Sequence, residues 1–254
     1  MEYFGDGDLF DYIEELNDND LLLDESEVRR IFRQMALGVK FLHDRNIAHR
    51  DIKPENFIIK KQHSSLTTCA EPGVARIDFV KMIDFGHAVH FADHQKLTEA
   101  LGTNRYRPPE IFDPYLTTVP REAHGRFKHA YQHKRVSCSY LAPPADVYAL
   151  GISLFNLLEG AHPDHGGELK NLRFFTDWKL LARKVSEDAK NLVRDMLADD
   201  PLNRLTIDQV DQLKFNFNLV IILRAKSAFN NKFRYCFSSF SRQNILNRYS
   251  NTVG

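Results

Sequence analysis

The chain has 254 residues, of which 43% are hydrophobic and 27% are charged, a composition ordinary for a soluble globular protein with one large domain or two small ones. Its formal net charge is zero, but seven Lys and Arg residues and no acidic residue follow Asp211, so residues 212–254 carry +7 and residues 1–211 carry −7. The three cysteines are widely spread, which indicates neither a disulfide framework nor a zinc site, and no apolar run is long enough to cross a bilayer. We therefore expect a reducing compartment, cytoplasmic or nuclear, and no membrane contact.

Hydrophobic periodicity predicts a mainly helical chain with a small β-hairpin. The strongest helical pattern runs from Ser26 to His43, where apolar residues recur at three- and four-residue spacing after a capping residue, Asp24 or Ser26. Short strands are predicted at 57–60 and 80–83, with a polar surface loop between them. Other helices are predicted at residues 9–13, at 147–158, where the pattern is apolar nearly all round, at 180–197 and at 207–213.

Three stretches have little periodicity. Residues 86–110 are predicted to form a long ordered loop, and a stretch rich in His, Lys and Arg, at about 115–142, is interpreted as an insertion. Residues 212–254 form a basic tail without an apolar stripe, predicted to be irregular or disordered. A short Phe-rich basic tail is not sufficient to indicate a nucleic-acid partner, so none is expected.

The polar residues of the chain are most concentrated between His49 and Asn56, directly after the strongest helix. Asp51 is a plausible proton acceptor there, and Asn56 offers an oxygen to a small hard cation. A second carboxylate, Asp84, lies where an apolar strand gives way to glycine. We expect these three side chains to converge on one bound ligand.

Five motifs in order across residues 1–210 resemble the large C-terminal lobe of a eukaryotic-type protein kinase of the serine/threonine branch. They are His49-Arg50-Asp51 with Asn56, Asp84-Phe85-Gly86, Pro108-Pro109-Glu110, Asp146 to Gly151, and Asp200-Pro201 followed by Arg204 and Thr206. The resemblance implies a kinase domain at 1–211 that contains the insertion, and a mainly α fold in which the small N-terminal β lobe is absent. Residues 84–110 would be its activation segment.

By this resemblance the chain transfers the γ-phosphoryl group of ATP to a protein hydroxyl with the help of Mg²⁺. Asp51 would orient the attacking hydroxyl, Lys53 would neutralise charge on the phosphoryl group, and Thr103 would bond near both. Asn56 and Asp84 would hold magnesium. His49 and Phe85 would belong to the family's regulatory stack over Asp146, and Gly86 to the metal-binding turn. Glu110 and Arg204 would form a buried ion pair.

The same resemblance assigns further ligand-binding roles, most of them outside residues 49–56, the stretch that resembles the family's catalytic loop. Glu2 and Phe4 would meet the adenine edge through their backbone, and Ile58 would also lie at the nucleotide. Asp8 and Glu55 match acidic positions that bind arginine upstream of the target hydroxyl, but the third such position is Asn156 here. A mild preference for basic protein or peptide substrates is therefore expected.

Arg50 usually faces a phosphate in this family, and Glu99 lies four residues before Thr103, near the usual phosphorylation site. We hypothesise that the Glu99 carboxylate replaces the phosphate. Thr98 is the alternative phosphorylation site, and in a third interpretation both residues lie in a solvated loop.

A glycine-rich loop, a strand lysine and a helix glutamate of a small lobe are not found in the sequence, which predicts weak or undetectable ATP turnover. One alternative function is therefore a catalytically silent interaction module, and another is a truncated gene product. A small-molecule phosphotransferase is a third possibility, which the Gly102 to Glu110 sequence disfavours.

Overall fold

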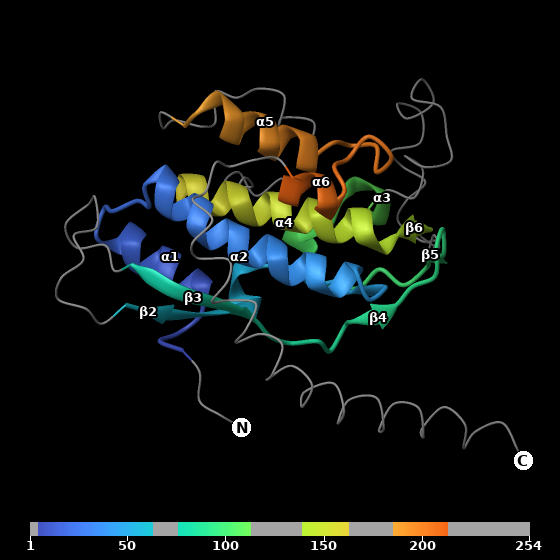
Figure 1. The fold of residues 1–254 in the computed structure, drawn as a ribbon, viewed down its shortest axis with the longest axis horizontal. Helices are drawn as coiled ribbons and strands as arrows, with labels where there is room; N and C mark the ends of the chain where they lie inside the picture. Colours follow the sequence, from blue (N-terminus) through green and yellow to red (C-terminus); the bar gives the residue numbers. More distant parts are fainter. Residues whose placement is uncertain (1–4, 63–75, 113–138, 163–184, 213–254) are drawn as a thin grey trace, which may run out of the picture. The chain divides into compact units, whose positions relative to one another are not determined.

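The computed structural model describes residues 5–62, 76–112, 139–162 and 185–212 (Figure 1). The chain divides into two compact units, Met1–Leu213 and Lys214–Gly254, and every described residue belongs to the first. Within these residues, none of the helices combines the length and the apolar character that a membrane span requires. Most of the predicted basic tail and of the predicted insertion lies outside the described residues.

Two long helices, α2 (Glu25–His43) and α4 (Ala142–Glu159), form the centre of the first unit. Asp24 caps α2, because its side chain accepts a hydrogen bond from the Glu27 amide. Helix α4 is buried on nearly all sides, as its sequence predicts, and is capped by Gly160, whose φ of +71° suits a glycine cap. The two helices pack against each other and fix the core around which the loops are arranged.

The remaining helices surround this pair (Figure 1). Helix α5 (Glu187–Met196) packs on α4, and α6 (Ile207–Gln212) packs on α2. Helix α1 (Leu9–Asp18) buries Leu9, Tyr12, Ile13 and Leu16, and it lies against the short helix η1 (Pro54–Asn56). The other short helices are η2 (Asn104–Tyr106) and α3 (Pro109–Phe112).

In the described residues, three two-stranded antiparallel sheets lie among the loops. The largest pairs β2 (Phe57–Lys61) with β3 (Ile77–Met82), and its buried face rests on α2. Strands β1 (Ile47–Ala48) and β4 (Val89–His90) pair beside the catalytic loop. Strands β5 (Lys96–Leu97) and β6 (Tyr140–Leu141) pair farther along the chain.

The prediction of a mainly helical fold with few strands is confirmed for the described residues. Several predicted boundaries were wrong, because tertiary packing extends the local pattern. Helix α1 continues five residues beyond the predicted Ile13, to Asp18, and β3 begins at Ile77 rather than Val80. Helix α4 begins at Ala142, since two prolines are compatible with the first turn of a helix.

Candidate active site

The loop between β1 and η1 is anchored by the buried carboxylate of Asp146 on α4. Asp146 Oδ2 accepts a hydrogen bond from the His49 amide at 2.8 Å, and Oδ1 accepts one from the Arg50 amide, also at 2.8 Å. His43 Nε2 lies 3.0 Å from Asp146 Oδ2. Arg50 adopts a φ of +67°, a conformation that costs energy for a residue with a side chain. The two amide contacts therefore hold the loop in a strained conformation immediately before Asp51.

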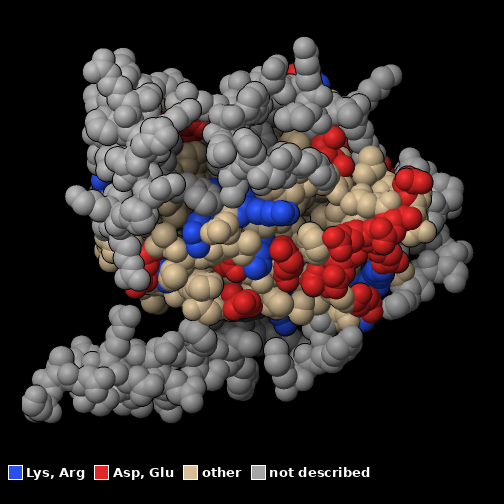
Figure 2. Space-filling view, turned by 180° about the vertical axis from the view of Figure 1, so that it is seen from behind, with Lys and Arg blue, Asp and Glu red and all other residues tan. Residues whose placement is uncertain are grey.

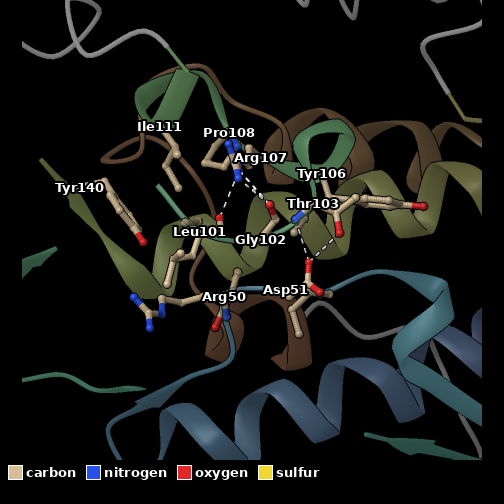
Figure 3. A pocket seen from close by; sticks show the side chains of 14 residues that line it. Arg50, Asp51, Leu101, Gly102, Thr103, Tyr106, Arg107, Pro108, Ile111 and Tyr140 are labelled. Atoms are coloured by element: carbon tan, nitrogen blue, oxygen red, sulfur yellow. Dashed lines mark hydrogen bonds between the residues drawn. The ribbon is translucent and has the colours of Figure 1, made fainter. Parts of the chain in front are cut away.

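The carboxylate of Asp51 is fixed on both oxygens. Oδ1 accepts hydrogen bonds from the amide and the hydroxyl of Thr103, each at 2.8 Å (Figure 3). Oδ2 lies 3.2 Å from Lys53 Nζ and accepts a bond from Asn56 Nδ2 at 3.1 Å. Burial alone raises the pKa of Asp51, but the bonds from Thr103 and the charge of Lys53 outweigh it and lower the pKa. Asp51 is therefore an ionised acceptor held in one orientation.

Asn56 joins the catalytic loop to the segment that carries Asp84. Its Nδ2 also donates to the Asp51 carbonyl at 2.7 Å, and its own carbonyl accepts a bond from the Ile83 amide at 2.9 Å. Asp84 directly follows Ile83, is exposed, has a φ of +57° and accepts a bond from the Gly86 amide at 3.1 Å. The backbone therefore places Asp84 beside Asn56.

The donor set of Asn56 and Asp84 fits a small hard cation. Because Asn56 uses Nδ2 as a donor toward Asp51, its Oδ1 remains the atom suited to a metal, and Asp84 adds carboxylate oxygens. No group of three or more His, Cys, Asp or Glu residues that could hold a metal occurs in the described ranges. A cation here would depend on these two residues together with oxygens of its ligand or of water, as magnesium bound to phosphates commonly does.

His49 and Phe85 form the apolar base of this region. Their rings make an edge contact with centroids 5.3 Å apart, and His49 Nε2 lies 3.1 Å from the Ile83 carbonyl. Burial lowers the pKa of His49, although Asp146 opposes the shift. The ring is accordingly neutral at physiological pH and serves as a packed hydrogen-bonding group.

Arg50 points away from this base toward the activation segment. Its Nε donates to the His87 carbonyl at 2.6 Å, and its Nη1 lies 3.3 Å from Glu99 Oε2. The Glu99 side chain is 70% exposed, whereas that of Arg50 is 9% exposed. The sequence hypothesis that these two residues meet thus agrees with their positions, while its regulatory meaning stays a prediction.

A small pocket lies between the catalytic loop, residues 101–111, Tyr140 and the first half of α4 (Figure 3). Gly102 lines this pocket and has a φ of +89°. A Cβ at this position would lie only 2.3 Å from the Arg50 carbonyl oxygen. Arg107 donates to the Leu101 and Gly102 carbonyls (Figure 3). Only glycine therefore lets the segment approach closely enough for Thr103 to reach Asp51.

Glu110 and Arg204 form a bidentate ion pair in the core, with N–O distances of 2.7 and 3.0 Å. Their side chains are 1% and 0% exposed. The guanidinium also donates to the Pro144 and Ala198 carbonyls and lies over the ring of Tyr148. The pair ties α3 to the loop before α6, as its sequence motif predicts.

The predicted ligand-binding residues have different environments. Asp8 caps α1 by accepting a bond from the Asp11 amide at 2.9 Å, a structural role that sequence analysis did not assign. Ile58 pairs with Asp8 and lies on the outer face of β2. Glu55 Oε2 and Asn156 Oδ1 are buried without a hydrogen-bond partner in the described part of the chain. Glu2 and Phe4 lie outside the described residues.

Two tyrosines near the site were missed by sequence reasoning. The Tyr106 hydroxyl accepts a bond from Asn156 Nδ2 at 3.1 Å, and burial raises its pKa well above the ordinary value. The Tyr140 hydroxyl donates to the Glu99 carbonyl at 3.0 Å. Tyr140 carries no motif signal, because it lies at the edge of a low-pattern stretch.

Comparison with known proteins gives consistent matches. Residues 1–216 match the family model described as protein kinase domain. The serine/threonine protein kinase OSK3 of Oryza sativa subsp. indica is 30% identical over 214 residues, which are 83% of this chain and 34% of that protein. The phosphorylase b kinase gamma catalytic chain, liver/testis isoform, of Bos taurus is 30% identical over 215 residues, 82% of this chain and 44% of that protein. The chain thus spans about a third to under half the length of these relatives.

Proposed function

Because the chain belongs to the protein kinase domain family, we propose that it is a serine/threonine kinase that transfers the γ-phosphoryl group of ATP to a hydroxyl of a protein. The observation that supports this most is the environment of Asp51. Four contacts from Thr103, Lys53 and Asn56 orient its carboxylate, and Asn56 is hydrogen-bonded to the segment that carries Asp84.

In the proposed reaction the bond between the γ-phosphorus and the oxygen of the departing ADP breaks, and a bond to the substrate hydroxyl oxygen forms. Asp51 orients that hydroxyl and accepts its proton, for which an ionised carboxylate is suited. Lys53, held by Thr103 at 2.8 Å, offsets negative charge on the transferring group. Magnesium, when held by Asn56 and Asp84, would neutralise the phosphates. The protein thus contributes mainly positioning and charge.

We also propose that the described part of the chain is the large lobe of the kinase fold. Its helices α2 and α4, the β2–β3 hairpin and the activation segment are the elements that the family resemblance assigns to that lobe.

The proposal is tested by incubating the full chain with radiolabelled ATP, Mg²⁺ and matched peptides that contain serine, threonine or tyrosine. We expect labelling of the serine and threonine peptides that is lost in Asp51→Asn. Nucleotide binding should depend on Mg²⁺ and weaken in Asp84→Asn. If the wild type labels no more than Asp51→Asn and binds no nucleotide, the silent interaction module is the better assignment.

A preference for basic substrates is the proposed specificity. The unpartnered Glu55 Oε2 and Asn156 Oδ1 both belong to residues that interact with Tyr106. Asn156 donates to the Tyr106 hydroxyl, and the Glu55 charge adds to burial in raising the pKa of Tyr106. A guanidinium could satisfy both oxygens. The surface nearby is acidic, since α1 and its flanks expose Asp6, Asp11, Glu14, Glu15, Asp18 and Asp20, and Figure 2 shows acidic side chains gathered on one part of the molecule.

This specificity is tested with serine peptides that differ only in an upstream arginine or alanine. The arginine peptide should have the lower KM, and Glu55→Gln should remove most of the difference without changing the KM for ATP. Asp195→Asn, at a carboxylate of α5, is the control for a general loss of negative charge. Equal KM values for the two peptides in the wild type would refute the preference.

We further propose that Glu99 substitutes for a phosphate opposite Arg50 in the activation segment. The contact at 3.3 Å and the burial of Arg50 support it. The unphosphorylated chain should then have the full activity of which it is capable, and Glu99→Ala should reduce it. Activity unchanged in Glu99→Ala would remove this proposal while leaving the assignment as a kinase intact.

A further inference from the structure

Strand β6 and Tyr140 connect the activation segment to the residues immediately before α4. Lys96 pairs with Leu141 and Leu97 pairs with Tyr140 in the antiparallel β5–β6 ladder. Two residues farther along, the Glu99 carbonyl accepts the Tyr140 hydroxyl at 3.0 Å. Backbone and side chain of one short strand thus hold both ends of residues 96–99.

The Tyr140 ring is anchored in the interior. It is 2% exposed and belongs to a cluster with Ala48, Ile111, Ala142 and Ala145, against which Val89, Phe91 and Leu97 also pack. This cluster contains residues from before the catalytic loop, from α3 and from the start of α4. Tyr140 also lines the pocket that Arg50 and Leu101 share (Figure 3). The ring is therefore fixed to the rigid part of the unit, and its hydroxyl extends to the segment.

The ion pair between Arg50 and Glu99 is too exposed to hold the segment alone. Ion pairs with a solvent-exposed partner contribute little to stability, and the Glu99 side chain is 70% exposed. A buried aromatic ring and a short ladder resist opening far better. The placement of the Glu99 backbone, and with it the direction of its carboxylate, must come chiefly from β6 and Tyr140.

We propose that Tyr140 is a positioning residue: with β6 it braces residues 96–99 so that Glu99 faces Arg50. The inference rests on the proposed kinase function for its effect on catalysis. The mechanical part, that Tyr140 holds the segment closed, depends only on contacts within this chain.

Hydrogen exchange of the full chain tests the mechanical part without any activity. Tyr140→Phe removes only the hydroxyl and should speed exchange of the amides in residues 96–101 about fivefold, the effect of one net hydrogen bond. Tyr140→Ala also removes the ring and should speed it about a hundredfold or more. Tyr148→Phe removes the hydroxyl of a second buried tyrosine, which lies on α4, and should change the exchange of residues 96–101 less than about twofold. Unchanged exchange in Tyr140→Phe would overturn the brace, even if Tyr140→Ala does not fold.

A double-variant comparison tests the effect on catalysis. Tyr140→Phe should lower kcat by about fivefold with little change in the KM for ATP, matching its effect on exchange. In a Glu99→Ala background the same substitution should still speed exchange but lower kcat no further, because its effect passes through Glu99. An equal fall of kcat in both backgrounds would show a merely structural role and overturn the positioning assignment. If the wild type has no activity and binds no nucleotide, the kinase proposal fails, and the exchange result alone decides whether the brace exists.

Discussion

Loss of the Glu110 carboxylate should strongly destabilise the first unit. Glu110→Gln keeps the shape of the side chain but leaves the Arg204 guanidinium, which is 0% exposed, without its counter-charge. The Pro144 and Ala198 carbonyls still accept bonds from Arg204, but they cannot neutralise it. Removing one partner of a buried pair costs about 3–5 kcal/mol. At about 2–4 °C per kcal/mol for a unit of this size, the expected fall in Tm is roughly 6–20 °C.

Urea unfolding followed by circular dichroism measures this cost, and an exposed ion pair provides the control. Glu15 lies 2.6 Å from Lys61 and is 59% exposed, so Glu15→Gln should cost less than about 1 kcal/mol. The double variant Glu110→Met, Arg204→Met should recover much of the stability lost in Glu110→Gln, because it leaves no buried charge. A cost for Glu110→Gln no greater than that for Glu15→Gln would refute the reasoning that burial makes this pair essential.

Three further predictions concern the loop, the site and pH. Gly102→Ala should lower the free energy of unfolding more than Gly7→Ala. Both glycines have a positive φ, but of the two only Gly102 has no room for a Cβ. The midpoints of urea unfolding of the two variants measure the difference. Thr103→Val should lower kcat about ten- to a hundredfold with little change in Tm, because it removes the hydroxyl bonded to the catalytic carboxylate, as initial rates would show. Burial raises the pKa of Glu25, but the hydrogen bonds from Ser186 outweigh burial and lower this pKa below 4.5. The stability that the ionised Glu25 contributes is therefore complete above pH 4.5 and is lost as the pH falls through the folded-state pKa. Glu25→Gln should flatten this acid limb, and an unchanged dependence of the urea midpoint on pH would contradict it.

The elements with strong local patterns were predictable. The apolar stripe of α2 and the all-round apolar sequence of α4 determined their positions to within a few residues. Prediction also identified the protein kinase family, which the match over residues 1–216 confirms. The ion pair of Glu110 and Arg204 came from a motif rather than from periodicity, since the two residues are 94 positions apart.

Contacts without a local pattern were not predictable. The N-cap role of Asp8 was missed although the predicted helix start at residue 9 was correct, because the family resemblance assigned Asp8 to substrate binding. The ladder between β5 and β6 joins two pairs of residues, too short for any strand periodicity. The unpartnered oxygens of Glu55 and Asn156 depend on which donors lie nearby in three dimensions, and sequence spacing carries no such information.

The β2–β3 hairpin has its outer backbone groups engaged on both sides. Along β3, the Ile77 amide donates to Glu27 Oε1 and the Val80 amide donates to Gln34 Oε1, both from α2. Along β2, Ile59 exchanges hydrogen bonds with Asp6 and Gly7. A strand from another molecule would have to displace these groups before it could extend the sheet, so the hairpin is protected against the intermolecular strand addition through which exposed edges lead to aggregation.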